Sequence, residues 1–385
     1  MLIVAIVIAA IRGWSSGADQ GPPSWAVAIN DRGQIVGNES DPVTGGTRAL
    51  YWEKGTVTVL PPLPGDEWAE AADINYAGQI VGWSYATTRE GFELPAAVLW
   101  DAGSVIPLGT LPGGLWSKAV SIGEDGRIAG SSGLNETESH AVLWRNRQIT
   151  ELATVPGSLH SEAHAVNARG QIVGSAWTGS ALVGVLWENG MATRLGAPGG
   201  DVESNALDIG DGGEIVGWTA SGGGHHAARW HDGGMATLEA LPGGRSSEAA
   251  AINDTGQIVG WSQTAGGASR AALWEDGIVR DLGTRRGDRG SEAIGINAAG
   301  EVAGASRSAD GTSRAVTWRN GKISDLPSTG KTAGATRDDA FRDIGWTRVV
   351  GTVRRRRWSA RIAPHGGGAM ALLGSSRPTL HRGYG

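Results

Sequence analysis

Short apolar segments recur along the whole chain, and each is bounded by turn-forming Gly, Asn, Asp or Pro residues. In one well-formed copy they occupy 248–252, 257–262, 270–274 and 278–282. The first segment is apolar at consecutive positions, which is typical of a sheet covered on both faces. The 3.6-residue period of a helical repeat is absent from the pattern. Each repeat is therefore predicted to contain four short strands.

The first two strands of each repeat are predicted to form a tight hairpin, as in Ile-Asn-Asp-Thr-Gly-Gln-Ile-Val-Gly at 252–260. Asn suits the first position of a type I turn, and the following Gly supplies the positive φ that closes the hairpin with a bulge. A non-glycine residue there would cost about 1–2 kcal/mol. We therefore interpret these glycines as backbone requirements: Gly33, Gly78, Gly126, Gly170, Gly213, Gly256 and Gly300. A second glycine, Gly260 in this copy, lies inside the outgoing strand and indicates a bulge or a close backbone neighbour.

A tryptophan ends the third strand of seven repeats, at intervals of 43 to 48 residues. A buried Trp removes about 150–250 Å² of surface from water, so we expect that the main role of these side chains is to stabilise the core. They are Trp52, Trp100, Trp144, Trp187, Trp230, Trp274 and Trp318.

Four strands in a repeat of this size are typical of one propeller blade. The Ala-rich and Gly-rich first strand is expected to be innermost. A degenerate eighth copy of the repeat occupies 343–351, with a further strand at 369–373. In this copy Ala363 replaces the tryptophan that ends the third strand of the other repeats. We therefore expect an all-β, eight-bladed propeller over 25–374, with seven blades as the alternative.

The two ends of the chain are expected to lie outside the propeller. Residues 1–24 form an apolar, signal-like segment and linker, and 375–385 a polar tail expected to be disordered. The apolar stretch 2–11 is too short to span a bilayer as a helix, which needs about 20 residues. The alternative is that this stretch forms a β-strand that joins the fold.

The repeat carries a recognisable set of motifs. They include His140-Ala141-Val142-Leu143-Trp144, the segment Leu-Gly-Thr-Leu-Pro-Gly-Gly at 108–114, and Gln-Ile-Val-Gly at 257–260. Together these resemble the HAF repeat of extracellular bacterial proteins, with Val or Ala in place of the Phe of the family name. The resemblance implies an extracellular or cell-surface, propeller-like protein, and it brings no established activity or catalytic residues.

Composition narrows the possible chemistry. The 385 residues include no Cys and carry a net charge of −6, so thiol chemistry, disulfides and a global attraction to nucleic acid are not expected. The turn Asn-Asp-x-Gly offers too few oxygens for calcium, and His225-His226 lacks a third ligand for zinc. We expect no metal, no cofactor, no stable membrane span and a monomer.

Candidate binding residues come from the loops. In a propeller, the connections between second and third strands, such as 131–139, emerge on the same face as the connections between blades. Variable loops on a rigid scaffold are where binding usually resides. Trp25, Trp68, Trp116 and His160 are assigned to this face, where they would suit a sugar or a peptide. The alternative is that each tryptophan fills a gap between blades.

Two sets of carboxylates are expected near the propeller axis. Glu70, Glu162, Glu248 and Glu292 occupy equivalent places just before the inner strand, and would surround one channel mouth. They would bind a cation or polyol, or else bond an adjacent blade. Asp73, Asp208 and Asp343 each precede the inner-strand Ile, and their pKa values would be perturbed if they face the axis. Acids spread around a ring do not form the close pair of general acid/base catalysis.

The sequence thus predicts a non-catalytic scaffold that binds carbohydrate or protein on its loop-rich face. The alternatives are a propeller hydrolase or lyase that uses the axial carboxylates, and a purely structural envelope protein.

Overall fold

The computed structural model describes residues 22–329, apart from 42, 87–93, 136–137, 198–202 and 222. The described residues are almost entirely short β-strands and turns. The strands are β1 (Ser24–Ile29), β2 (Ile35–Ser40), β3 (Thr47–Glu53), β4 (Thr56–Val59), β5 (Trp68–Ile74), β6 (Ile80–Tyr85), β7 (Ala96–Asp101), β8 (Ser104–Pro107), β9 (Trp116–Ile122), β10 (Ile128–Asn135), β11 (Glu138–Arg145), β12 (Gln148–Glu151), β13 (His160–Val166), β14 (Ile172–Trp177), β15 (Leu182–Glu188), β16 (Met191–Arg194), β17 (Ser204–Ile209), β18 (Ile215–Ser221), β19 (Gly224–His231), β20 (Gly234–Thr237), β21 (Ser247–Ile252), β22 (Ile258–Gln263), β23 (Ser269–Glu275), β24 (Ile278–Asp281), β25 (Gly290–Ile296), β26 (Val302–Arg307), β27 (Ser313–Arg319) and β28 (Lys322–Asp325).

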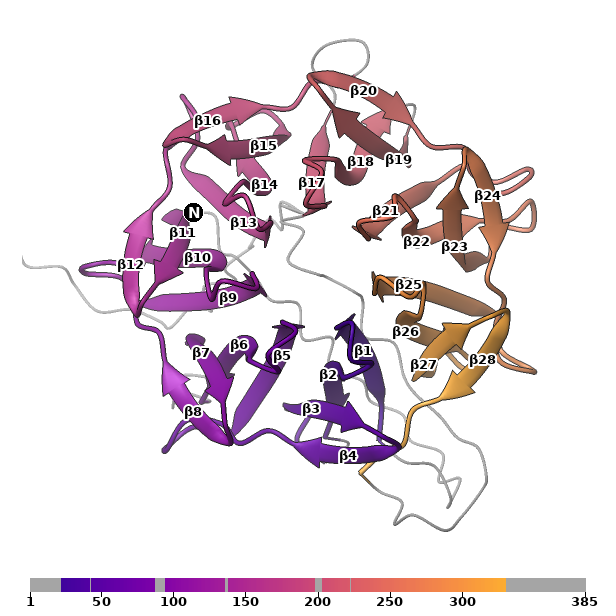
Figure 1. Ribbon diagram of the computed structural model, residues 1–385, viewed down its shortest axis with the longest axis horizontal. Helices are drawn as coiled ribbons and strands as arrows, with labels where there is room; N and C mark the ends of the chain where they lie inside the picture. The colour runs from indigo at the N-terminus through magenta and orange to yellow at the C-terminus, as the bar shows by residue number, and fades with distance from the viewer. Residues whose placement is uncertain are drawn as a thin grey trace, which may run out of the picture. The chain divides into compact units, whose positions relative to one another are not determined.

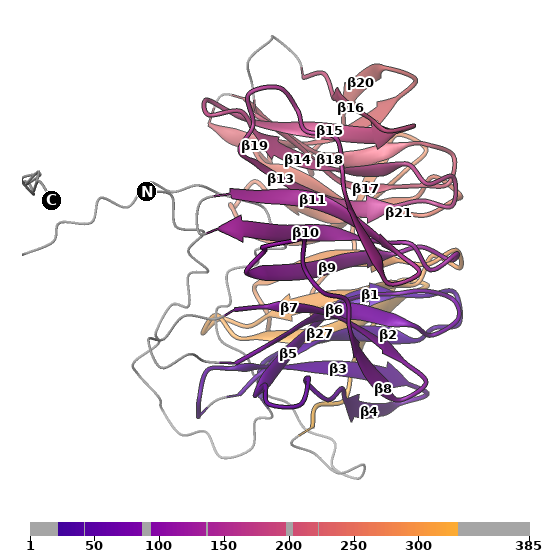
Figure 2. The ribbon, with the colours of Figure 1, turned by 90° about the vertical axis from the view of Figure 1, so that its left-hand side faces the viewer.

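Consecutive groups of four strands form antiparallel meanders, from β1–β4 to β25–β28, which we number blades 1 to 7. Blades 3 and 4 share one larger sheet through a single parallel bridge between Ser139 and His160. Figure 1 shows the first strand of each blade beside the central axis and the fourth strand at the periphery. The prediction of four-stranded propeller blades with the Ala-rich strand innermost is therefore confirmed. Turned on edge, the blades lie side by side (Figure 2).

Each inner hairpin has the predicted turn. In blade 1 the Gly33 amide donates to the Asn30 carbonyl (3.0 Å), and all seven turn glycines have positive φ, from 70° to 86°. The second glycine is explained by a close backbone neighbour. A Cβ on Gly260 would lie 1.9 Å from the carbonyl oxygen of Glu248, beside a register shift between Ala249 and Ala251. Only glycine fits there.

The repeated tryptophans lie in the cores between blades. In blade 2, Trp100 is buried with Val36 and Ala49 of blade 1, and its indole N–H donates to the Pro61 carbonyl (2.8 Å). Trp52, Trp187, Trp230, Trp274 and Trp318 donate to equivalent carbonyls. The indole nitrogen of Trp144 has no hydrogen-bond partner among the described residues. In the other six blades, the indole therefore joins the blade to the connection that precedes it.

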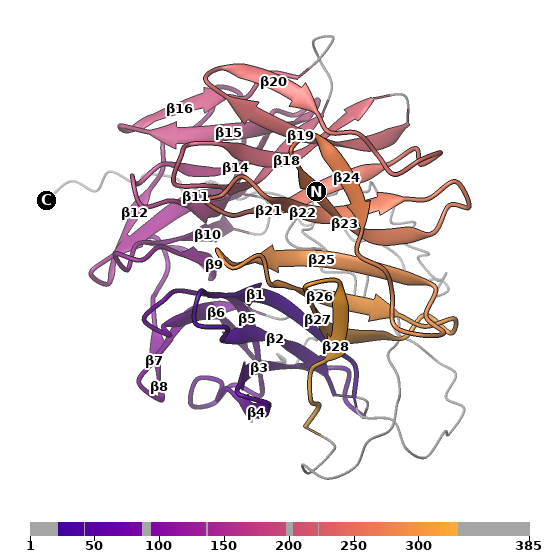
Figure 3. The same cartoon turned by 45° about the vertical axis from the view of Figure 1, so that its right-hand side comes forward.

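Blade 7 packs directly against blade 1, as Figure 3 shows for β25 and β1. The Asn297 side-chain amide donates to the Asn30 carbonyl (3.2 Å), which repeats the bond from Asn253 to the Asn297 carbonyl (3.0 Å) between blades 6 and 7. The indole of Trp52 also donates to the Pro327 carbonyl, beyond the last strand of blade 7.

The contact between blades 7 and 1 bears on the expected number of blades. The predicted eighth blade and Asp343 lie outside the described residues, as do the signal-like stretch 2–11 and the tail 375–385. Blades 7 and 1 meet through contacts of the kind found between blades 6 and 7, and the total number of blades stays a prediction.

Two further observations concern the sequence predictions. The segment 131–139, predicted to be a loop, is mostly strand, because β10 and β11 continue their pairing to Asn135 and Glu138.

Within the described part of the chain, no helix is long and apolar enough to cross a membrane.

Candidate functional site

One position on every inner strand forms a ring, and four of its members are the predicted glutamates. The position precedes the alanine that pairs with the crowded second glycine, as Glu70 precedes Ala71 opposite Gly82. We call the seven residues at this register the mouth ring. They are Trp25, Glu70, Lys118, Glu162, Asn205, Glu248 and Glu292.

The mouth ring faces across the gap between blades. Trp25 pairs with Asn38 on β2, and residues directly opposite on adjacent strands share one face of a sheet. The side chain of Asn38 bonds both the amide (2.8 Å) and the carbonyl (3.0 Å) of Ala71 in blade 2. Side chains at the ring register therefore share the face that looks toward the following blade.

An axial cavity of about 110 Å³ lies two or more residues further along the inner strands, and all seven inner strands contribute to it. Val27, Ala72, Val120 and Ile294 line it at one level. Its polar members are Asp73, Ser121, His164 and Asp208. Because the mouth ring lies nearer the start of each inner strand, it separates the connections between blades from this cavity.

Asp73 and Asp208 connect neighbouring blades. Asp73 accepts from the amides of Ile74 (2.8 Å) and of Ile122 in blade 3 (2.9 Å). Asp208 accepts from the amides of Ile209 and of Ile252 in blade 6, both at 2.9 Å. Burial raises the pKa of Asp73 to about 6, against the effect of these bonds, and the charge of Asp208 adds to the rise. The two acids come from blades 2 and 5, and each carboxylate is held by backbone.

Blade 4 places a histidine beside a ring glutamate. The Nδ1 atom of His164 lies 2.8 Å from the Ala206 carbonyl oxygen, and its Nε2 atom is 3.8 Å from Oε2 of Glu162. His164 is only 3 % exposed. Neither its Nε2 nor Glu162 Oε2 has a hydrogen-bond partner in the part of the chain that the structure describes. These two buried atoms therefore have unused hydrogen-bonding capacity.

Blade 5 carries a second pair with unused hydrogen-bonding capacity. Asn205 pairs with Trp218, and their side chains are 0 % and 2 % exposed. Neither amide atom of Asn205 nor the indole nitrogen of Trp218 has a partner among the described residues. His225 stacks on Trp218 with ring centroids 3.9 Å apart, and its Nδ1 lies 3.7 Å from Glu248 of blade 6. A polar group seated here would meet a donor and an acceptor together.

The remaining ring members differ in charge, with glutamates in blades 6 and 7 and a lysine in blade 3. In blade 7, burial raises the pKa of Glu292 to about 7, and the charge of Glu248 adds to the rise. In blade 3, the Lys118 ammonium lies 4.6 Å from the ring centre of Trp83. Within the ring, the buried atoms without a hydrogen-bond partner thus lie in blades 4 and 5, and a mutually repelling glutamate pair follows in blades 6 and 7.

The aromatic residues assigned to the loops lie elsewhere. Trp68, Trp116 and His160 are the first residues of β5, β9 and β13. The ring of Trp68 covers Gly46 of blade 1, where a Cβ would approach it to 2.1 Å. Trp116 covers Gly133 (2.0 Å), which is its partner on β10 of the same blade. His160 contacts Ser139 of blade 3 (3.3 Å), and burial lowers its pKa. The contact of Trp68 favours the interpretation that this tryptophan fills a gap between blades.

Sequence reasoning missed Lys118, Asn205, Trp218 and His164. The first two share the glutamates' register, but the prediction grouped residues by type and not by position. Counting back from the alanine opposite the second glycine would have found them. Among the described residues, no group of three or more His, Asp or Glu is arranged to hold a metal ion.

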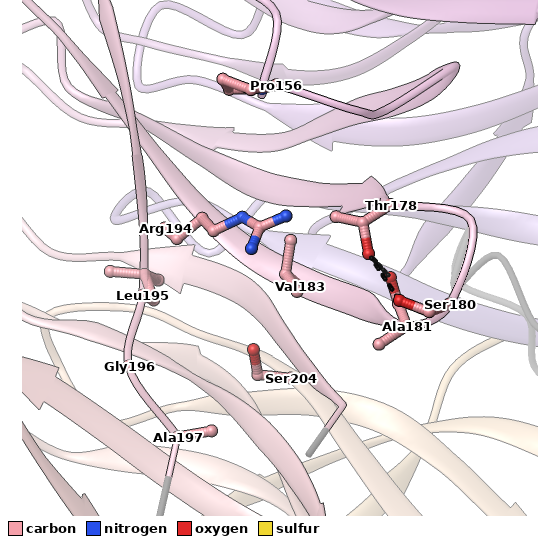
Figure 4. Close-up of a pocket in the computed structure, with 10 residues that line it drawn as sticks. All are labelled: Pro156, Thr178, Ser180, Ala181, Val183, Arg194, Leu195, Gly196, Ala197 and Ser204. Carbon is pink, nitrogen blue, oxygen red and sulfur yellow. Dashed lines mark hydrogen bonds between the residues drawn. The ribbon is translucent and has the colours of Figure 1, made fainter. Parts of the chain in front are cut away.

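A larger pocket of about 510 Å³ lies away from the axis, between blade 4 and the start of blade 5 (Figure 4). Arg194, Thr178, Ser180 and Ser204 supply its polar side chains, and Leu195 and Val183 are among its apolar ones. Residues 198–202 lie outside the described residues. We place the candidate site at the mouth ring, because the buried unpartnered groups lie there.

No protein-family model and no curated protein matches this chain. The similarity to the HAF repeat therefore stays a prediction, without a family assignment.

Solved structures show the fold. The chain is similar to a puromycin-hydrolysing peptidase from Mycobacterium tuberculosis, with 13% identity, a TM-score of 0.57, and coverage of 81% of this chain and 54% of that one. It is similar to the β-propeller domain of the Trilobed protease from Pyrococcus furiosus, with 12% identity, a TM-score of 0.52, and coverage of 80% and 97%. The chain spans about half the length of the puromycin-hydrolysing peptidase. At these identities the comparisons establish a β-propeller.

Proposed function

We propose that this protein is a non-catalytic binding scaffold, exported to the cell surface or beyond, that binds carbohydrate or protein at the mouth ring. The observation that carries the proposal is the concentration of unused hydrogen-bonding groups there. Of the eight buried side-chain atoms without a hydrogen-bond partner among the described residues, three belong to the ring residues Glu162 and Asn205, and two belong to His164 and Trp218 beside them. An unpaired buried polar group costs about 1–3 kcal/mol, so groups kept in this state favour a role in binding.

The position of the ring supports the same proposal. The inner strand runs from the connection between blades toward the Asn-type turn, so its first residues lie on the face that also carries the links between second and third strands. Loops on this face surround the mouth ring and can enlarge a contact begun there. The chain also matches nearly the whole of an isolated propeller domain, and we propose that it forms a seven-bladed ring.

The hydrolase or lyase alternative has weaker support. The raised pKa of Asp73 would suit a general base. Asp73 and Asp208 nevertheless come from blades three apart, and each is bonded to the backbone of the next blade. That arrangement suits a structural link between neighbouring blades. The purely structural alternative offers no account of the buried unpartnered groups.

The proposal is tested with the full-length chain, on arrays of bacterial and plant polysaccharides and of peptides. Wild type is compared with Asn205→Leu, which removes both amide atoms, and with Trp218→Phe, which removes the indole N–H together with part of the ring. We expect at least one probe class to bind wild type and to bind both variants about tenfold or more weakly. Glu239→Gln, an exposed carboxylate outside the ring, is the control and should bind normally.

Stability distinguishes this result from loss of folding. Asn205→Leu removes a buried polar group that has no hydrogen-bond partner, and should leave the free energy of unfolding equal or raise it by about 1–2 kcal/mol. Trp218→Phe also opens a cavity, and should lower the free energy of unfolding. Weak binding by a variant that is at least as stable as wild type therefore identifies a binding residue. Unchanged binding by Asn205→Leu and Trp218→Phe, with every probe that binds wild type, would exclude the mouth ring as the site.

A further inference from the structure

A break in the repeat accompanies the pocket of about 510 Å³ between blade 4 and the start of blade 5. In three of the other connections between blades, an apolar residue placed directly before a proline is buried, as Leu111, Val155 and Leu241 are. The connection after blade 4 is one residue shorter, and Ala197 stands before its proline. A smaller side chain on a shorter connection leaves space between these two blades.

The residue that ends the fourth strand differs in charge between blades. In blade 6, Asp281 ends this strand and forms an ion pair with Arg270 on the third strand (3.6 Å between Oδ2 and Nε), and blade 3 has the equivalent pair. Blade 4 reverses the pattern, with Arg194 at the register of the acid and Val183 at the register of the base. The residues that end the fourth strand in the remaining blades and in blade 3, none of them basic, are Val59, Pro107, Glu151, Thr237 and Asp325.

The reversal leaves a guanidinium group at the pocket wall. Arg194 has no ion pair or hydrogen bond among the described residues, and its side chain extends from β16 into the pocket (Figure 4). The planar N–H fork of a guanidinium matches the two oxygens of a carboxylate. An exposed arginine by itself is an ordinary solvated side chain, so the other walls of the pocket decide what it can bind.

Those walls supply hydroxyl groups beside apolar surface. Thr178 and Ser180, on the link between β14 and β15, have hydroxyl oxygens 3.4 Å apart. The oxygen of Ser204 accepts from the Gly184 amide (2.9 Å), which leaves its own hydrogen to donate. Leu195 adds an apolar side chain. A few hydroxyl groups set among apolar surfaces suit a sugar ring, because the ring presents both hydroxyl groups and C–H faces.

We propose that this pocket binds a carboxylated sugar, a hexuronate residue of an acidic polysaccharide. The sugar carboxylate pairs with the guanidinium of Arg194, and the sugar hydroxyl groups bond the side chains of Thr178, Ser180 and Ser204. The pocket is separate from the mouth ring, so the inference goes beyond the proposed function and does not depend on it.

Other ligands fit this pocket less well. A phosphate monoester carries a charge of about −1.5 to −2 near pH 7, whereas the described lining supplies one cation, Arg194. A single Asp or Glu side chain of a peptide would pair with the guanidinium but leave most of the 510 Å³ unfilled. An apolar ligand would cover the charge of Arg194 without giving it a partner, which is unfavourable.

The test measures fluorescence anisotropy of an end-labelled galacturonate trimer with the full-length chain. The methyl ester of the same trimer keeps the rings and hydroxyl groups and removes the charge. We expect saturable binding of the acid form, and at least about tenfold weaker binding of the ester, because charge-assisted hydrogen bonds are lost. The net charge of −6 opposes nonspecific attraction of a polyanion. This comparison alters only the ligand and so does not depend on the folding of a variant.

Arg194→Gln removes the guanidinium group and should weaken binding of the acid form by about tenfold or more. The midpoint of thermal unfolding should change little, because Arg194 is exposed. Arg319→Gln removes an exposed arginine at the end of β27 and should bind normally. Equal loss in both variants would show diffuse attraction and would overturn the proposal. So would equal binding of the acid and the ester, or no carboxylate-dependent binding up to about 1 mM.

Two further probes test the class of ligand. Tighter Arg194-dependent binding of a sulfated sugar trimer, or of an end-blocked peptide containing Glu, would overturn the hexuronate assignment. Glu162→Gln alters the mouth ring and should leave hexuronate binding unchanged. If binding is lost in Glu162→Gln and kept in Arg194→Gln, the sugar binds at the mouth ring. That result would overturn this inference while supporting the proposed function.

Discussion

The side chain of Asn297 donates a hydrogen bond to the backbone carbonyl of Asn30, 267 residues earlier in the chain. Asn253 makes the same bond to the Asn297 carbonyl, between blades 6 and 7. The oxygen atom of each side chain meanwhile accepts from amides of its own hairpin turn. One residue type therefore shapes the turn and joins the blades, and it does both where the ring closes.

This relationship predicts the effect of Asn297→Asp. The change keeps the acceptor that shapes the turn and replaces the donor with an oxygen facing the Asn30 carbonyl. We expect a loss of about 1–3 kcal/mol in the free energy of unfolding, measured in urea. Asn253→Asp is the matched variant, and should cost at least as much because Asn253 also donates to Gln257. A costly Asn253→Asp beside a neutral Asn297→Asp would show that blades 7 and 1 are not closed in solution.

The two glycines of one hairpin should respond differently to alanine. Gly256 has a φ of +82° with open space around its Cα, so Gly256→Ala should cost about 1–2 kcal/mol in backbone strain. Gly260→Ala would drive a Cβ into the Glu248 carbonyl and should cost about 3 kcal/mol or more. The midpoints of thermal unfolding compare them. Equal costs would contradict the close strand contact.

Two equivalent tryptophans offer a comparison of packing with hydrogen bonding. Trp187 donates to the Ala153 carbonyl (2.8 Å), whereas the Trp144 indole has no partner among the described residues. Both are buried. Trp187→Phe should therefore destabilise the protein by about 1 kcal/mol more than Trp144→Phe. Equal losses in urea unfolding would mean that the indole bonds contribute nothing beyond packing.

Stability should depend on pH through Glu292. Its folded-state pKa of about 7 lies above its ordinary value of 4.5, so the folded state holds the proton more tightly. Stability then falls as pH rises from about 4.5 to 7 and changes little above that range, because the unfolded chain has released its proton earlier. Asp73, with a pKa raised to about 6, adds a loss of the same sign.

Glu292→Gln should remove most of the contribution of Glu292 and raise stability at pH 8 by at most about 3 kcal/mol. Thermal unfolding of both proteins between pH 5 and pH 8 measures the difference. Parallel curves would contradict a burial-raised pKa at Glu292. Glu239→Gln is again the control, since Glu239 is exposed.

Local chemistry explains which features were predictable. The Asn-Asp-x-Gly turn, the positive φ of Gly256 and the burial of Trp274 each depend on residues within one repeat, and the structure has them where they were expected. Trp68 was assigned to a loop because the Pro and Gly residues before it mark a connection. It instead begins β5, because its ring covers Gly46 of the preceding blade. That contact cannot be read from one repeat.

The sequence by itself determined the four-stranded unit, its inner strand and the shared position of Glu70, Glu162, Glu248 and Glu292, because hydrogen-bonding and packing rules act over a few residues and recur with the repeat. Only the tertiary structure decided that blade 7 meets blade 1, because ring closure depends on the summed angles between blades. It also decided that His164 lies beside Glu162 and that Asn205 and Trp218 are buried with polar atoms that have no hydrogen-bond partner among the described residues. Such pairings arise where the inner strands converge on the axis, across gaps that no repeat encodes alone.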